Sequence, residues 1–207
     1  MRPKANKGRL YILSAPSGTG KTTLCSSLLS QVAELKESVS FTTRKPRAGE
    51  VQDTDYTFTT VDEFKNMLAA GMFIEWAEVF GNYYGTSIKR IDDILSTGCD
   101  VLLDIDTQGV RQIKAKHIDA VFIFILPPSL EILEKRLRGR NKDSEEDILR
   151  RLRVAREEIK ECVFYDYVIV NDVFDLTLSQ LKSVIISNRL RADGLDYQWL
   201  ENNFGIH

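Results

Sequence analysis

The chain has 207 residues, which is enough for one domain with a hydrophobic core. Its composition is 43% hydrophobic and 28% charged with a formal net charge of −2, so it lacks the basic field that nucleic-acid and membrane-surface proteins use, and we expect neither partner. The three cysteines form no CxxC pair and no apolar run reaches the length of a signal peptide or a membrane span, which predicts a cytoplasmic protein without a disulfide or zinc framework.

Apolar runs with little polar alternation predict four buried strands, over residues 10–13, 101–105, 120–126 and 167–170. A helical pattern follows each run, over residues 21–35, 108–116, 130–138 and 176–190. Strands that alternate with helices in this way are joined by right-handed crossovers. The sequence therefore predicts an α/β fold, in which helices flank a parallel sheet core.

The middle of the chain departs from this alternation. Short alternating segments such as residues 56–59 predict small, half-exposed strands. Helices are predicted over residues 61–70, where Thr60 can cap the start, and over residues 86–97. We interpret residues 40–90 as a mixed α/β lobe inserted at the ligand edge of the sheet. A further helix is predicted over residues 145–161, where Ser144 can form an approximate capping box.

A glycine-rich turn directly after the first strand is the clearest local signal. It reads Ala15, Pro16, Ser17, Gly18, Thr19, Gly20, Lys21 and Thr22, and it matches the phosphate-binding pattern G-x-x-x-x-G-K-[ST] except at Ala15. Gly18 and Gly20 let backbone N–H groups approach phosphate oxygens, and the next helix adds its positive N-terminal end. Ala15 is tolerable if its φ is negative.

The same turn predicts how a nucleotide would be held. Lys21 would reach the β- and γ-phosphates, and the Thr22 hydroxyl would bind Mg²⁺. Glycine-rich turns between a strand and a helix also occur without nucleotide, but the Gly-Lys-Thr triplet in this setting favours nucleotide binding. The turn by itself does not identify the acceptor of the phosphoryl group.

A smaller cationic group begins the inserted lobe. Arg44 and Arg47 stand on either side of Pro46 and can form a fork around a phosphate. Taken alone, this segment could equally be a solvated basic loop.

Five motifs occur together and in order: the phosphate-binding loop at 15–22, Ser-Phe-Thr-Thr-Arg-Lys-Pro-Arg-Ala-Gly-Glu at 40–50, Gly-Asn-Tyr-Tyr-Gly-Thr at 81–86, Leu-Asp-Ile-Asp at 103–106 and Ile-Val-Asn-Asp at 169–172. With these motifs the chain closely resembles the guanylate kinases from about residue 9 to residue 190. The resemblance implies a P-loop NTPase fold and a role in purine metabolism, namely the ATP-dependent, Mg²⁺-assisted phosphorylation of GMP to GDP, with dGMP as a further acceptor that gives dGDP.

The resemblance also implies a division of the chain. Residues 7–190 would form the kinase domain, with a core of 7–39, 91–135 and 157–190, a GMP-binding lobe of 40–90 and a helical lid of 136–156. Residues 191–207 form a tail that carries no family pattern. This tail could pack on the domain or join a second subunit, so a homo-oligomer is compatible with the sequence.

Site roles are implied residue by residue. Arg44, Arg47, Tyr56 and Tyr84 would hold the GMP phosphate, and Ser40, Glu75 and Thr86 would read the guanine. Residues 15–22 and Asn171 would bind ATP, while Asp104 and Asp106 would lie near the acceptor nucleoside, with Asp104 joining Thr22 at Mg²⁺. The catalytic cations would be Lys21, Arg44 and the lid arginines Arg136, Arg140 and Arg151.

Elementary chemistry supports the assignment of Glu75. Guanine presents adjacent N1–H and N2–H₂ donors, and one carboxylate can accept both, whereas adenine presents an acceptor at N1 and lacks the amine. The alternative for Glu75 is a surface charge at a helix end. Strand alternation predicts that Asp104 and Asp106 share one face, and helical spacing predicts the same for Arg136 and Arg140 unless Gly139 ends the helix.

Two other functions compete with GMP phosphorylation. Guanylate-kinase-like domains in some scaffold proteins bind peptides without catalysis, but they typically lose the loop lysine or the acceptor residues, which are present here. A related kinase with another acceptor would share the loop but would not need Glu75, Ser40 and Thr86.

Overall fold

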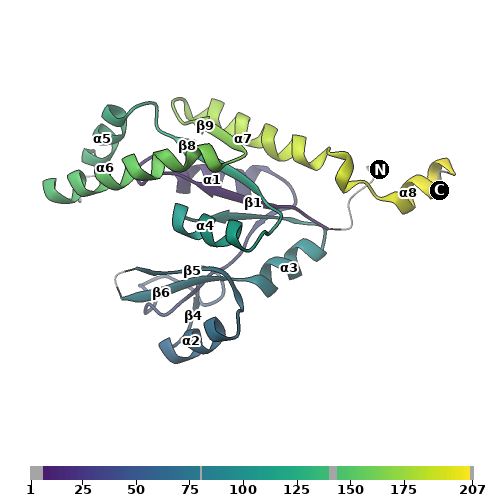
Figure 1. The fold of residues 1–207 in the computed structure, drawn as a ribbon, viewed down its shortest axis with the longest axis horizontal. Helices are drawn as coiled ribbons and strands as arrows, with labels where there is room; N and C mark the ends of the chain where they lie inside the picture. Colours follow the sequence, from purple (N-terminus) through teal and green to yellow (C-terminus); the bar gives the residue numbers. More distant parts are fainter. Residues whose placement is uncertain (1–6, 80, 140–143, 206–207) are drawn as a thin grey trace.

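The computed structural model describes residues 7–79, 81–139 and 144–205, and they form an α/β fold with two sheets (Figure 1). The main sheet has five strands in the order β2-β7-β1-β8-β9, and all of its neighbouring strands run parallel. The strands are β1 (Leu10–Ser14), β2 (Leu35–Glu37), β7 (Asp100–Asp104), β8 (Val121–Leu126) and β9 (Tyr167–Val170).

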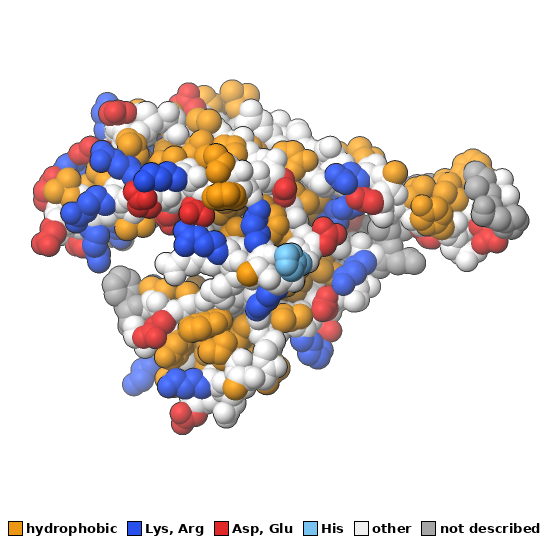
Figure 2. All heavy atoms as spheres, viewed as in Figure 1, with side chains coloured by type: hydrophobic (Ala, Val, Ile, Leu, Met, Phe, Trp, Pro, Cys, Tyr) orange, Lys and Arg blue, Asp and Glu red, His pale blue; other side chains and the backbone are white. Residues whose placement is uncertain are grey.

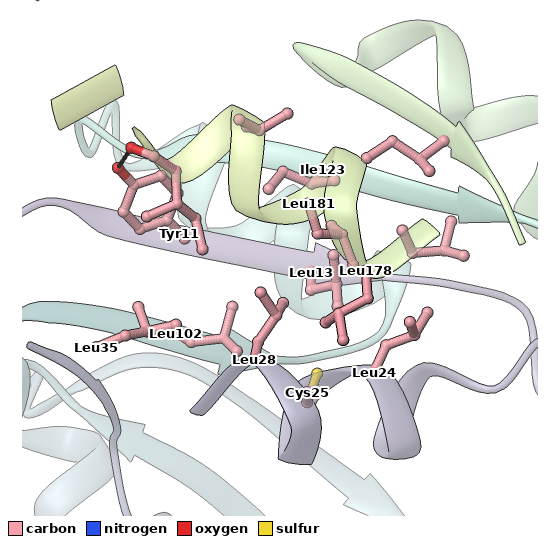
Figure 3. Packing of buried hydrophobic residues seen from close by; sticks show 14 of the residues in the cluster. Tyr11, Leu13, Leu24, Cys25, Leu28, Leu35, Leu102, Ile123, Leu178 and Leu181 are labelled. Atoms are coloured by element: carbon pink, nitrogen blue, oxygen red, sulfur yellow. Dashed lines mark hydrogen bonds between the residues drawn. The ribbon is translucent and has the colours of Figure 1, made fainter. Parts of the chain in front are cut away.

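Helices cover both faces of this sheet. Alternation along β1 sends Tyr11 and Leu13 to one face, where α1 (Lys21–Gln31) and α7 (Phe174–Arg189) bury them. Figure 3 shows Leu178 and Leu181 of α7 packed on that side of β1. Leu10 and Ile12 point to the other face and meet α3 (Ile88–Ser96) and α4 (Thr107–Ala115). Burial on both faces explains why the strand sequences are continuously apolar.

The four predicted strands and the parallel sheet are confirmed, but one strand was not predicted. The predicted helix over residues 21–35 is too long: α1 ends at Gln31, and Leu35 begins β2. The chain reverses at Glu34, which has a φ of +62°. In β2 only Leu35 is buried, so three residues at the edge of a sheet leave almost no apolar pattern to read.

The inserted lobe contains the second sheet, in the order β4-β3-β6-β5. Its strands are β3 (Phe41–Thr42), β4 (Thr57–Phe58), β5 (Phe73–Val79) and β6 (Asn82–Ser87). Helix α2 (Val61–Ala69) starts at the predicted cap, Thr60, and buries Phe64 in a stack against Phe73. The predicted helix over residues 86–97 starts too early, because Thr86 pairs with Glu75 in the sheet and Ser87 caps α3.

Two helices pack together beside the phosphate-binding loop, at the upper left of Figure 1. α5 (Leu130–Arg138) matches its predicted range and is capped at its end by Gly139, and α6 (Glu145–Lys160) begins after the predicted cap, Ser144. They bury Leu133, Leu137, Ile148, Leu152 and Ala155 between them. Arg140 lies outside the described residues, so its predicted alignment with Arg136 is not described.

The C-terminal tail leaves the body of the protein. After a short 3₁₀ turn (Ala192–Gly194), α8 (Tyr197–Phe204) projects at the right of Figure 1. Among the described residues, no helix has the length and apolar character needed to cross a bilayer.

The core packing gives a prediction about α7. Replacing Leu181, which is fully buried against β1, by Ala should lower the free energy of unfolding by about 2–5 kcal/mol, since a cavity would replace its side chain. The matched control is Leu176→Ala on the same helix, where the side chain is 64% exposed and the change should stay within about 0.5 kcal/mol. Urea unfolding measures both values, and equal losses would contradict this account of the core.

Candidate functional site

The phosphate-binding loop connects β1 to α1 at the carboxyl edge of the main sheet. Gly18 and Gly20 have φ values of +95° and +100°, and Ala15 is not among the described residues with positive φ, as its motif position requires. A Cβ on Gly20 would lie 2.9 Å from Asn171 Nδ2, and one on Gly18 would lie 2.8 Å from Leu137 Cδ2. Both glycines are therefore needed for backbone conformation and for close packing.

Two side chains from later in the chain hold this loop in place. The Thr19 carbonyl accepts hydrogen bonds from Asn171 Nδ2 at 2.7 Å and from Arg136 Nη1 at 3.3 Å. Arg136 Nη2 also donates to the Asn171 carbonyl at 2.9 Å. The structure thus brings the predicted ATP residue Asn171 and the predicted lid arginine Arg136 to the backbone of the loop.

Lys21 and Asp104 form an ion pair at the sheet edge. Lys21 Nζ also donates to the Ile105 carbonyl at 2.9 Å, and the Lys21 side chain is only 18% exposed. One cavity is lined by Asp104 and Asp106 and by the loop residues Ala15, Pro16, Ser17, Gly18 and Thr22. Most of the predicted ATP residues therefore line one cavity, although Thr19 and Asn171 are not among its lining residues.

The sequence predicted that Asp104 and Asp106 share one face of a strand, and this prediction is wrong. Strand β7 ends at Asp104, and Asp106 caps α4 by accepting a hydrogen bond from the Gly109 N–H at 2.9 Å. Alternation applies only within a strand, so the turn after β7 removes its basis here.

Glu158 on α6 also lines the loop cavity, and the sequence analysis did not identify it. Burial raises the pKa of Glu158 to about 7, with a further contribution from Asp106 and an opposing one from Lys21. A glutamate on a highly charged helix resembles any solvated residue, so no local signal would have distinguished it.

The three predicted guanine-reading residues form one hydrogen-bonded chain. Ser40 Oγ lies 3.1 Å from Thr86 Oγ1, and the Thr86 hydroxyl donates to Glu75 Oε1. Glu75 sits in β5 and is 8% exposed, so its alternative placement as a surface charge at a helix end is wrong. Burial raises the pKa of Glu75, and the Thr86 hydrogen bond partly offsets this effect.

The predicted phosphate-holding residues gather around Arg44. Its guanidinium lies 5.4 Å from the Tyr56 ring centroid, and the Tyr56 and Tyr84 rings are 6.0 Å apart in an edge arrangement. Arg44 also donates twice to Glu50, at 2.8 and 3.0 Å, and this pair lowers the pKa of Glu50. Glu50 was not predicted, although it ends the basic motif. Arg47 is exposed, and its backbone N–H donates to Glu50 at 2.7 Å.

The space-filling view shows a hollow between the inserted lobe below and the main sheet with α5 and α6 above (Figure 2). Of the predicted lid arginines, Arg136 contacts the loop and Arg151 is half-buried on α6. The candidate site thus has two parts with different chemistry. The residues of the loop cavity lie on the main sheet, and the residues around Arg44 and Glu75 lie in the inserted lobe.

Comparisons with known proteins agree with this geometry. The chain is 53% identical to the guanylate kinase of Geobacter metallireducens over 186 residues, which cover 90% of this chain and 92% of the relative. It is 52% identical to the guanylate kinase of Escherichia coli strain K12, over 89% and 90% of the two chains. The crystal structure of guanylate kinase from Anaplasma phagocytophilum superposes with a TM-score of 0.74 at 33% identity and covers all of both chains. The family model described as guanylate kinase matches residues 7–188, and the chain therefore belongs to the guanylate kinase family.

Proposed function

We propose that this protein transfers the γ-phosphoryl group of ATP to GMP, which forms GDP, and to dGMP, which forms dGDP, and that ADP is released in both reactions. One observation carries the proposal: a buried carboxylate, Glu75, ends the Ser40–Thr86 hydrogen-bonded chain in a protein whose phosphate-binding loop departs from the motif only at Ala15. Burying an ionisable carboxylate costs free energy. An acceptor site that did not recognise guanine would gain nothing that offsets this cost. The named relatives at about half identity support the same activity.

The roles of the site residues form part of this proposal. Lys21 and the loop 15–22 hold the ATP phosphates, and Arg44, Arg47, Tyr56 and Tyr84 hold the GMP phosphate. Glu75, Ser40 and Thr86 read the base, and Asp104 and Asp106 lie toward the acceptor nucleoside. Asn171 supports the ATP site, and Arg136, Arg140 and Arg151 close over the transferring group.

Catalysis by these residues depends on positioning and charge. The acceptor oxygen is largely anionic near neutral pH, since the second phosphate pKa is about 6, so no strong general base is required. Arginines from separate segments would offset the repulsion between two polyanions, and closure of the lobe and lid would exclude water as a competing acceptor.

The residues that line the loop cavity fit a Mg²⁺ site in which the protein supplies only a few of the ligands. Thr22 and Asp104 both line this cavity, and a hydroxyl with one carboxylate suits Mg²⁺, which takes most of its ligands from phosphates and water. No cluster of three or more His, Cys, Asp or Glu ligands occurs within the described ranges. Thr22 and Asp104 would hold Mg²⁺ there, and the ion would supply positive charge that offsets the charge of the ATP phosphates. Lys21 would exchange its ion pair with Asp104 for the phosphates.

The proposed function gives a first prediction of its own, which concerns the acceptor and the loop lysine. ADP release should be observed with GMP and dGMP and should be near background with AMP, CMP, UMP and TMP.

Lys21→Met should abolish turnover, because it removes the charge at the phosphates while keeping most of the buried stem. Circular dichroism of the variant checks that the fold is retained. If another monophosphate is the active acceptor, the assignment to GMP fails.

Glu75 gives a second prediction. Glu75→Gln should lower kcat/KM for GMP by at least roughly tenfold while leaving the KM for ATP unchanged, because Gln presents an amide donor to the guanine donors. Glu78→Gln on the same strand is the matched control, because Glu78 is exposed. An unaltered kcat/KM for GMP in the Glu75 variant would remove this residue from the base site.

The raised pKa of Glu75 gives a third prediction, about stability. Its folded-state pKa lies above the ordinary value of 4.5 because of burial, so the wild type loses stability as the pH rises through that pKa. Glu75→Gln does not ionise, and its unfolding free energy relative to wild type should therefore increase from about pH 4 to about pH 8. Urea unfolding at several pH values measures the difference, and a difference that falls with pH would contradict the burial of the charge.

A further inference from the structure

Helix α4 of the core lies along the edge of β5 in the inserted lobe. Within the described part of the chain, strand β5 is the last strand of its sheet, and one of its edges has no neighbouring strand. The Gln112 side chain occupies this edge: its Oε1 accepts from the Trp76 N–H at 3.1 Å, and its Nε2 donates to the Trp76 carbonyl at 2.7 Å. One side-chain amide thus replaces both hydrogen bonds that a neighbouring strand would make with this residue.

Lys116, the C-cap residue of α4, makes a second attachment four residues after Gln112. Its Nζ donates to the carbonyls of Phe73 and Ile74, at 2.7 and 2.8 Å. The register of β5 against β6 shifts between Phe73 and Glu75, as it does at a β-bulge. Bulges re-aim side chains, and here Gln112 and Lys116 fix the backbone on both sides of Glu75.

Gly109 completes the contact of α4 with Glu75. A Cβ at this position would lie 3.1 Å from Glu75 Oε2 and 3.2 Å from Ile105 Cδ1. Because Gly109 has no side chain, the Glu75 carboxylate can occupy this space. Its other oxygen, Oε1, accepts from Thr86, so the carboxylate is held between β6 and α4.

We propose that α4 determines how the protein distinguishes the 2-amino group of the base, with Gly109 and Gln112 as positioning residues for the Glu75 carboxylate. This inference rests on the proposed function. Gly109, Gln112 and Lys116 are spaced three and four residues apart and so share one helix face. Helix α4 begins at the carboxyl edge of the main sheet, where Asp106 caps it beside the loop cavity. The helix that positions the Glu75 carboxylate therefore also borders the loop cavity.

Gly109→Ala is the sharpest test, because Ala is compatible with a helix and adds a single methyl group next to Glu75 Oε2. The added methyl group should displace the carboxylate by a few tenths of an ångström. GMP and inosine monophosphate, which differ only in the 2-amino group, are compared by kcat/KM and by dissociation constant. The preference for GMP should fall roughly tenfold in Gly109→Ala and also in Gln112→Leu, while the KM for ATP stays unchanged.

Gln108→Leu is the matched control, because it makes the same substitution on an exposed part of the same helix and should preserve the preference. A merely structural role for Gly109 and Gln112 would reduce both substrates equally, and an unchanged preference in Gly109→Ala overturns the inference. If the wild type binds GMP without turnover, the proposed function fails while the dissociation constants still test α4. If it does not bind GMP at all, both fail.

Discussion

The parallel pairing of β1 with β7 is the constraint from which the candidate site follows. Leu13 is in register with Asp104, so the loop after β1 and the carboxylate that ends β7 meet at one edge of the sheet. The ion pair of Lys21 with Asp104 and the hydrogen bond of Lys21 to the Ile105 carbonyl both depend on that register. Ligands bind at such edges because the carboxyl ends of the strands and the amino ends of the helices converge there.

The second requirement is close approach of the backbone. The phosphate-binding loop packs so tightly against Asn171 and Leu137 that a Cβ at Gly20 or Gly18 would come within 3 Å of them. The same device recurs at Gly109, where the absence of a side chain admits the Glu75 carboxylate. Glycine therefore permits close packing beside two groups for which we propose separate binding roles, the phosphate-binding loop and the Glu75 carboxylate, and in both cases a contacting residue comes from a distant part of the chain.

Charge in this protein is balanced locally. Arg44 pairs with Glu50, Lys21 pairs with Asp104, and Glu75 accepts a hydrogen bond from the Thr86 hydroxyl, so these three groups proposed to meet a nucleotide each have a partner within the chain. Such partners keep the side chains ordered before the ligand arrives, which reduces the entropy lost on binding. A nucleotide that bound to these groups would therefore have to replace or share their partners.

The sequence by itself determined the features that depend on neighbouring residues. The loop 15–22, the buried strands, the cap at Thr60 and helix α5 are local, since dihedral preferences and apolar periodicity act over a few residues. The family resemblance supplied Ser40, Glu75 and Thr86 together, and the structure joins them by hydrogen bonds. Only the tertiary structure revealed β2, Glu50, Glu158 and the attachment of Gln112 to Trp76, which stand 36 residues apart. A polar side chain on a helix looks solvated until its partner is known, and long-range packing alone decides which partner it meets.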